Sequence, residues 1–442
     1  MELMGRAYNW RATKTPERPY IHAYHTSLVD KIYLCSKPNP QAGGSVQVHL
    51  TFEQALERIA RIDALTRGIP KIFYLVGWQF EGHDSKYPAW SEVNRHLMRP
   101  GDRTSADSLR WLMRAARLYN STVSLHLNMQ DAYENSPLWE TYSRAKLLIG
   151  KGGLWGGEQA YLIDLRKEWE LGLAQKRIDE LCRVLPLVDA GTVHIDAFWP
   201  AGDDPEGQLE TMRRIIRHWR NKGIDVTTEG IVTPNLNRGL VGLVPMAWHI
   251  NYDLWKKSAE FTENDYMEIP APLFCGGSDH SYRRLLFGSS MQGEGIPDDQ
   301  PETYLASFCL ETLPWQYLNR FERQGIFRDG DIVQVEYADD VVVRADLERQ
   351  TTAIHHQEVL LRDGNDIFIP AAWQKKPEVI AYSKNGYHIR SWKLPESWMD
   401  HSEVAVRPIS EHGLGEPVSF PIIDGQIELS LEKGQALSVT LN

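Results

Sequence analysis

The chain of 442 residues lacks the features that mark several specialised classes of protein. Its four cysteines, Cys35, Cys182, Cys275 and Cys309, are widely spaced and form no CxxC pair, which argues against a disulfide framework or a structural zinc site. It has no long uncharged apolar run, so no membrane-spanning helix is expected. Its formal net charge of −11 disfavours contact with a phosphate backbone, so no nucleic-acid partner is expected.

Signals for targeting and for cofactors are also missing. The first residues lack the basic, apolar and small-residue order of a secretory signal, so the chain is expected to be cytoplasmic. Its histidines and acidic residues show neither HExxH nor EF-hand spacing, so we predict no metal. No glycine-rich phosphate turn follows the first strand predicted in the main domain, 71–79, and no cofactor is predicted. Nothing in the sequence specifies an oligomeric state.

Tryptophan and tyrosine, by contrast, are plentiful, with 15 and 18 residues. Sugar rings present C–H faces that pack on aromatic faces, so the composition favours a neutral carbohydrate ligand. The alternative is that these rings only fill the core. A composition of 42% hydrophobic and 24% charged residues is that of an ordinary globular protein in either case.

Helices and strands are predicted to alternate from Thr51 onward. TFEQ at 51–54 matches a helix-capping box, and Gly68 with Pro70 ends this helix before the apolar strand 71–79. The same unit recurs, with helices near 109–119, 168–184 and 204–223 and strands at 121–129, 160–165, 192–198, 224–230, 245–250 and 271–276. This order favours an α/β fold, a (β/α)8 TIM-like barrel of residues 51–325, over a doubly wound sheet.

Two further segments flank the predicted barrel. Residues 1–50 contain short β-prone pieces around the turn-rich KPNPQAGG, which indicates an N-terminal β-rich extension. From residue 326 the helical patterns stop, and apolar and polar residues alternate in stretches such as DIVQVEYADDVVVRADL. Residues 326–442 are therefore predicted to form a C-terminal antiparallel β-sandwich.

Two carboxylates end neighbouring predicted strands. Asp196 interrupts the apolar strand TVHIDAF, where an unpaired charge would cost several kcal/mol, so it is either ion-paired or catalytic. Glu229 ends the next strand, IDVTTEG, and its alternative role is that of a helix N-terminal carboxylate. Because strand ends of a barrel meet at one mouth, the pair fits glycoside cleavage, with Asp196 as nucleophile and Glu229 as general acid/base.

The stereochemical outcome depends on the gap between these carboxyl groups. Retaining glycosidases hold them about 5–5.5 Å apart, and inverting enzymes need a wider gap that admits a water molecule. Adjacent strand ends favour the shorter distance, so a retaining mechanism is predicted.

Other polar and aromatic residues at strand ends are candidates for sugar binding. After the first of these strands come Trp78, His83 and Asp84, in WQFEGHDS, where the alternative for the Asp is an Asx turn that only shapes the loop. His126 and Asn128 alternate along strand 121–129 and should face the barrel axis, although a core imidazole is an equally ordinary role for the His.

Three weaker candidates complete the predicted site. Asp164 in YLIDL repeats the pattern of Asp196, and Trp155 lies in the glycine-rich GGLWGGEQ, which suits a lid. Trp199 follows the nucleophile strand. Each of the three has a purely structural alternative. Asp279 and His280, after 271–276, are a still less specific signal.

Together these motifs resemble a known family. YLVGWQFEGHDS, LHLNMQDAY, VHIDAFWP and VTTEG, in this order, resemble the catalytic barrel of the endo-α-N-acetylgalactosaminidases, glycoside hydrolase family 101, and their exo-acting relatives in family 129. The resemblance covers roughly residues 50–300. It implies that Asp196 is the nucleophile and Glu229 the acid/base, that His83 and Asp84 contact a galactosamine-type sugar, and that His126 and Asn128 match the HxN element.

The leading hypothesis is therefore retaining hydrolysis of α-linked N-acetylgalactosamine, or a galactose-type residue, in O-glycans or small glycoconjugates. One alternative keeps the barrel and the carboxylates but cleaves α-galactosides or α-glucosides. Another is a glycan-binding protein without catalysis, against which the acid/base pair speaks.

Overall fold

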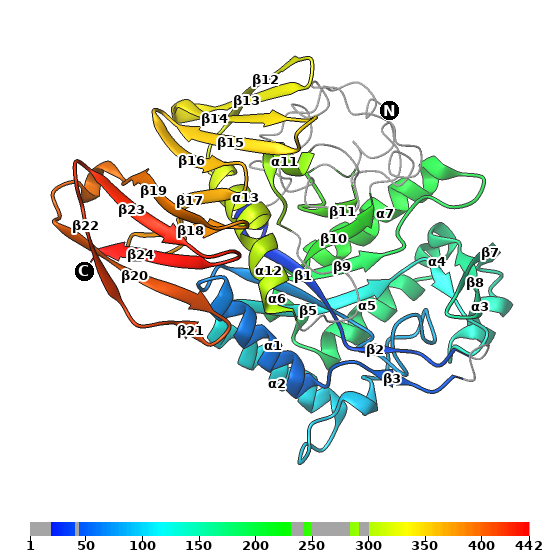
Figure 1. Ribbon diagram of the computed structural model, residues 1–442. Helices are drawn as coiled ribbons and strands as arrows, with labels where there is room; N and C mark the ends of the chain where they lie inside the picture. Colours follow the sequence, from blue (N-terminus) through cyan, green and yellow to red (C-terminus); the bar gives the residue numbers. More distant parts are fainter. Residues whose placement is uncertain are drawn as a thin grey trace.

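The computed structural model describes residues 19–39, 44–230, 240, 242–249, 283–290 and 300–441. Its two main parts are a parallel sheet with flanking helices and a large antiparallel sheet formed by the C-terminal third of the chain (Figure 1). An α/β fold with a C-terminal antiparallel β domain is thus confirmed. The predicted strand 271–276 and the residues Asp279 and His280 lie outside the described residues.

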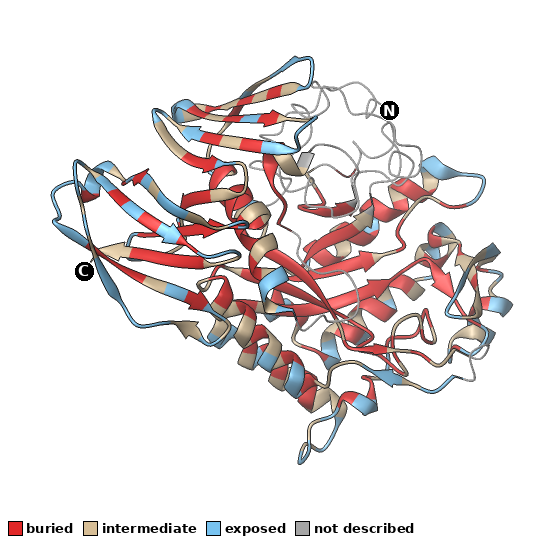
Figure 2. Cartoon of the chain, viewed as in Figure 1, coloured by how far each residue is buried: buried red, intermediate tan, exposed pale blue. Residues whose placement is uncertain are grey.

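Within the described residues the parallel sheet has six strands in the order β1-β4-β5-β9-β10-β11, and every neighbouring pair is parallel. All carboxyl ends therefore lie at one edge. Most side chains of these strands are buried, as Figure 2 shows, which explains their nearly continuous apolar sequences. The strands are β1 (Leu28–Tyr33), β4 (Lys71–Val76), β5 (Ser121–Asn128), β9 (Thr192–Asp196), β10 (Asp225–Gly230) and β11 (Ala247–His249).

The predicted helices cover this sheet. Thr51 and Gln54 form the predicted capping box at the start of α1 (Phe52–Leu65), and α2 spans Ser105–Ala115. Asp204 caps α7 (Pro205–Arg220) through the N–H of Gly207. The single helix predicted near 168–184 is two helices, α4 (Leu165–Glu170) and α5 (Leu173–Val184), because Gly172 between them has a φ of +74°.

One predicted strand has a different place in the fold. Residues 160–165 were expected to continue the parallel sheet, but β8 (Glu158–Ile163) pairs antiparallel with β7 (Leu148–Trp155) and β6 (Asp131–Ala132) in a separate sheet. Apolar periodicity identifies a strand but not its partner, and the short turn after Trp155 permits an antiparallel hairpin.

The parallel sheet also begins earlier than expected. β1 lies within residues 1–50, the segment predicted as an N-terminal extension, yet it pairs with β4 from Leu28↔Lys71 to Tyr33↔Val76. The two short strands β2 (Cys35–Ser36) and β3 (Gln47–Val48) then pair with each other. The N-terminal segment therefore contributes both an edge strand and a hairpin next to the carboxyl edge.

The C-terminal domain is an antiparallel sheet of eleven strands, with β19 and β23 paired beside it. In β23 exposed and buried residues alternate, as the sequence pattern predicts. Its strands are β12 (Arg323–Asp329), β13 (Ile332–Tyr337), β14 (Val341–Asp346), β15 (Thr351–His356), β16 (Val359–Asp363), β17 (Asp366–Pro370), β18 (Glu378–Ser383), β19 (Tyr387–Lys393), β20 (Glu403–Ser410), β21 (Gly413–Leu414), β22 (Val418–Pro421), β23 (Gln426–Leu431) and β24 (Ala436–Leu441).

The two parts are packed on each other. Helices α11 (Arg283–Phe287), α12 (Pro301–Ser307) and α13 (Leu313–Leu318) share an apolar core with β13–β18 and with the start of β1. Beside this core, the Arg67 guanidinium forms two hydrogen bonds with Glu378, at 2.7 and 3.2 Å. The C-terminal domain therefore packs against the part of the chain that forms the parallel sheet and stabilises it. Among the described residues, no helix is both long and apolar enough to span a membrane.

A buried ion pair anchors α4 and α5 next to the loop that follows β4. Glu168 is 0% exposed, and its Oε1 accepts hydrogen bonds from Arg177 Nε (2.9 Å), from Arg177 Nη2 (2.6 Å) and from the Tyr142 hydroxyl. Arg177 also donates to the carbonyl oxygen of Pro88 (3.0 Å). This network joins helices to the loop that carries His83 and Asp84.

We expect Glu168→Ala to lower the free energy of unfolding by about 3–5 kcal/mol, because it leaves the Arg177 charge buried and unpaired. Chemical denaturation measures this loss. Glu170→Ala is the matched control, since Glu170 is 58% exposed and its pair with Arg166 contributes less than about 1 kcal/mol. Equal losses in the two variants would contradict the assignment.

Candidate active site

The two predicted catalytic carboxylates lie on neighbouring strands at the carboxyl edge of the parallel sheet. Asp196 is the last residue of β9, Glu229 lies near the end of β10, and the two strands are paired from Thr192↔Asp225 to Ile195↔Thr228. Glu229 Oε2 accepts the backbone N–H of Ala197 (3.4 Å). Ala197 has a φ of +44°, a left-handed backbone that costs about 1 kcal/mol or more for a non-glycine residue. The turn after β9 is thus strained where it meets Glu229.

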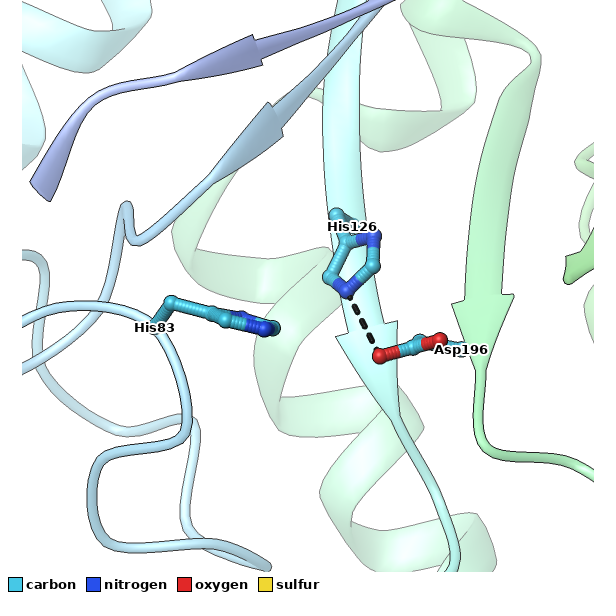
Figure 3. A group of neighbouring side chains, drawn as sticks. All are labelled: His83, His126 and Asp196. Atoms are coloured by element: carbon cyan, nitrogen blue, oxygen red, sulfur yellow. Dashed lines mark hydrogen bonds and ion pairs between the residues drawn. The ribbon is translucent and has the colours of Figure 1, made fainter. Parts of the chain in front are cut away.

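A histidine holds the carboxylate of Asp196. His126, on β5, places Nε2 3.0 Å from Asp196 Oδ2, and its ring lies 5.3 Å from that of His83, centroid to centroid (Figure 3). The indole N–H of Trp78 donates to the carbonyl oxygen of His126 (2.9 Å). Trp78 is fully buried, so it supports this strand instead of reaching the surface.

The group in Figure 3 is also the set of side chains whose donor atoms best match a metal site among the described residues. One atom each of His83, His126 and Asp196 lies within 4.8 Å of the others. The His126–Asp196 contact of 3.0 Å is explained by a hydrogen bond without an ion. We therefore interpret the group as a carboxylate oriented by imidazole, and the absence of a catalytic metal stays a prediction.

The loop after β4 is held in place by residues from the N-terminal segment of the chain. The backbone N–H of His83 donates to the carbonyl oxygen of Cys35 (2.8 Å), and Lys37 Nζ donates to the carbonyl oxygen of Asp84 (2.9 Å). Asp84 has a φ of +57°, and its Oδ2 lies 3.4 Å from Nε2 of His83. The side chains of His83 and Asp84 are therefore close to each other, and the β2 segment holds their loop in place.

A pocket opens beside this loop. It has a volume of about 370 Å³ and lies between the loop, the N-terminal hairpin and the tip of the β7–β8 hairpin. The residues around it are Tyr33, Ser36, Lys37, Asn39, Gly44, Ser45, Gln47, His83, Asp84 and Gly156. Most of the polar lining is amide and hydroxyl, which suits a ligand rich in hydroxyl groups.

A further carboxyl group lies beside these residues. Asp131, in β6, is 3% exposed, and its Oδ2 accepts a hydrogen bond from Asn128 Nδ2 (2.8 Å). Burial, together with the negative charges of Asp84, Asp196 and Glu229, raises the pKa of Asp131 from 3.8 to about 7. Asp131 therefore keeps its proton up to about pH 7, far above the range in which an ordinary Asp ionises.

The remaining predicted site residues lie further from this centre. Asp164 caps α4 through the N–H of Lys167 (3.2 Å) and accepts from Gln208 (2.9 Å). These contacts fit the structural alternative for this residue. Trp155 is 47% exposed at the end of β7, and Trp199 is partly exposed three residues after Asp196. Neither belongs to the His83, His126 and Asp196 group.

Three residues near the site were missed at the sequence level. Asp131 stands inside LHLNMQDAY, but no simple rule separates it from a turn residue. Tyr33 and Lys37 lie in the segment interpreted as an extension, although Tyr33, like Asp196, is the last residue of a strand of the parallel sheet. Extending the strand-end argument to residues 28–33 would have found Tyr33.

The comparisons agree with the motifs. Residues 44–236 match the family model described as Endo-alpha-N-acetylgalactosaminidase. Among solved structures, the Alpha-N-acetylgalactosaminidase NagBb from Bifidobacterium bifidum, as a quadruple mutant, is similar at 15% identity and a TM-score of 0.57, over 78% of this chain and 59% of that one. Its GalNAc complex is similar at 14% identity and a TM-score of 0.57, over 80% and 61%. None of the curated proteins matches the chain in sequence.

These matches show the class of protein, because the chain carries a glycoside hydrolase domain. More narrowly, the model that residues 44–236 match is that of the endo-α-N-acetylgalactosaminidases, which confirms the resemblance carried by the strand-end motifs. All of His83, Asp84, His126, Asn128, Asp196 and Glu229 fall within the matched segment. The chain spans only 59% to 61% of the length of these solved relatives.

The raised pKa of Asp131 has a consequence for stability. An unfolded Asp with a pKa of 3.8 ionises before the folded one does, so this residue destabilises the fold progressively as pH rises from about 4 to about 7. We expect Asp131→Asn, which resembles the protonated acid, to raise the melting temperature more at pH 8 than at pH 5. A difference that is equal at both pH values would show that Asp131 ionises normally.

Proposed function

We propose that the protein is a retaining α-glycosidase that releases α-linked N-acetylgalactosamine. The single observation that carries the proposal is the placement of Asp196, held by His126, on the strand next to Glu229. Glycosidases need two carboxyl groups at one sugar, one of them ionised and one able to carry a proton. The carboxyl ends of β9 and β10 supply such a pair.

In this mechanism Asp196 Oδ attacks the anomeric carbon while Glu229 protonates the leaving oxygen. The His126 imidazole fixes the orientation of the Asp196 carboxylate, so that less freedom is lost on the way to the transition state. Glu229 then takes a proton from water, which hydrolyses the glycosyl-enzyme and restores both groups. The anomeric configuration is retained because it is inverted twice.

The fold that supports this chemistry is, we propose, a (β/α)8 barrel. The six described strands are all parallel and follow one another round the sheet in chain order, which is the arrangement of such a barrel. In barrels of this kind the active site lies at the carboxyl ends of the strands, and Asp196 and Glu229 lie there in this chain. The match of residues 44–236 to the family whose catalytic barrel the strand-end motifs resemble supports the same architecture.

The choice of sugar rests on the relatives. The matching family is described as acting on α-N-acetylgalactosaminides, and the relative from Bifidobacterium bifidum was solved as a GalNAc complex. In this chain the loop with His83 and Asp84 offers a carboxylate and an imidazole to neighbouring sugar hydroxyls, next to the pocket of about 370 Å³. An O-glycan or a small glycoconjugate is the proposed substrate.

We expect Asp196→Asn to lower kcat/KM on p-nitrophenyl α-N-acetylgalactosaminide at least about 10³-fold, since the amide is a poor nucleophile. Release of p-nitrophenol measures the loss, and NMR of the first sugar released by the wild type identifies the anomer. Asp204→Asn is the control, because Asn caps a helix as well as Asp does and α7 keeps its N-cap. Near-normal turnover by the Asp196 variant would exclude it as nucleophile.

Glu229→Gln should affect substrates according to their leaving groups. Without an acid, cleavage of a natural serine- or threonine-linked sugar should fall about 10²–10⁴-fold, whereas glycosylation by an activated aryl glycoside should change far less. Pre-steady-state kinetics with both substrates separates this step from hydrolysis of the intermediate. A uniform loss across leaving groups would assign Glu229 another role.

A further inference from the structure

The amide group of Asn128 has a fixed orientation beside the nucleophile. Its Oδ1 accepts the backbone N–H groups of Gln130 and Asp131, both at 2.9 Å, so the carbonyl end of the amide is identified by its donors. Nδ2 must then be the donor to Asp131 Oδ2, at 2.8 Å. The amide cannot rotate by half a turn without losing three hydrogen bonds.

In this arrangement one N–H of the Asn128 amide has no acceptor within the described residues. Nδ2 carries two hydrogens, and within the described residues only one of them has an acceptor, although the Asn128 side chain belongs to a residue that is only 1% exposed. Asn128 is the Cα partner of Asp196 in the β5–β9 ladder, so both side chains leave the sheet on the same side. A buried N–H without a partner costs free energy unless a ligand accepts it.

One carboxyl oxygen of Asp131 is likewise available to bind a ligand. Oδ2 is engaged by Asn128, but in the described part of the chain Oδ1 makes no hydrogen bond. The acidic groups that act on Asp131 include Asp84 and Tyr87 in the loop after β4, Tyr133 after β6, Asp196 on β9 and Glu229 on β10. The basic groups nearby contact other members of this set, His126 at Asp196 and Lys37 over the ring of Tyr133. The hydrogen bond from Asn128 favours the ionised form, but burial and the neighbouring negative charges outweigh it and raise the pKa of Asp131 to about 7, so below that pH Oδ1 carries a proton that it can donate.

We propose that Asn128 and Asp131 together bind the carbonyl oxygen of an acetamido group on the sugar. This assignment rests on the proposed function and deepens it, because it names the residues that distinguish an N-acetylated sugar from one with a free hydroxyl. The two neighbouring donors, one amide N–H and one carboxyl O–H, match in number the two lone pairs of an amide carbonyl oxygen.

The choice of an acetamido group follows from the kind of hydrogen bond available. A sugar hydroxyl both donates and accepts, so it would bind an ionised carboxylate as readily as a neutral acid. A carbonyl oxygen only accepts, and an ionised Asp131 would repel it. A pair in which both members donate is therefore selective for the carbonyl oxygen, and the selectivity depends on the proton on Asp131.

Equilibrium binding of two sugars tests this assignment without requiring turnover. Isothermal titration of the wild-type protein with N-acetylgalactosamine and with galactose, at pH 5.5 and pH 8.5, gives the ratio of their dissociation constants. We expect the preference for N-acetylgalactosamine to fall at least about tenfold between the two pH values, the equivalent of one hydrogen bond replaced by a repulsive contact. Any general effect of pH on the pocket cancels in the ratio.

Asp131→Asn supplies the decisive variant, because its amide carbonyl still accepts from Asn128 and its N–H₂ donates at every pH. Its preference should equal that of the wild type at pH 5.5 and persist at pH 8.5. Asn128→Asp keeps the acceptor for both backbone N–H groups but removes the donor, so it should lose the preference at both pH values.

A wild-type preference that does not change with pH would overturn the proposal, as would a loss at pH 8.5 that persists in Asp131→Asn. Absence of any preference for N-acetylgalactosamine at pH 5.5 would also overturn it. Hydrolysis of p-nitrophenyl α-N-acetylgalactosaminide by the wild type decides the proposed function separately. The two failures are therefore distinguishable.

Discussion

The crowding of carboxyl groups at one edge of a buried sheet is the constraint on which the rest of the site depends. Asp84, Asp131, Asp196 and Glu229 are close enough that three of them raise the pKa of the fourth, Asp131. Ionised carboxylates in such a space repel one another, so they need either a compensating partner or a proton. For Asp196 the partner is the imidazole of His126, and for Asp131 it is the proton.

Much of the surrounding structure holds these groups in place. Lys37 and Cys35, from the N-terminal hairpin, bind backbone atoms of the loop that carries His83 and Asp84. The buried pair of Glu168 and Arg177 anchors the same loop from the other side, through Pro88. Such supports fix a site more precisely than a free surface loop would, which is what a reaction sensitive to small displacements requires.

How far the sequence predicts this protein depends on the range of the interaction involved. The capping box at Thr51 and the buried strands β4, β5, β9 and β10 are set by neighbours in the chain, and their predicted positions are confirmed. The partner of β8 is set by residues distant in sequence, and there the prediction of another parallel strand was wrong. The site residues differ in the same way. Asp196 and Glu229 can be recognised from the local sequence, as charges at the ends of apolar strands, whereas Asp131 cannot.

The sequence by itself determined the class of fold, the family motifs and the two carboxylates on consecutive parallel strands, because each is written in local periodicity and in the order of strands. Only the tertiary structure decided that His126 supports Asp196, that Asp164 caps a helix, and that the pKa of Asp131 is raised. The reason is physical: a pKa and a hydrogen bond depend on burial and on partners that the chain brings together from far apart.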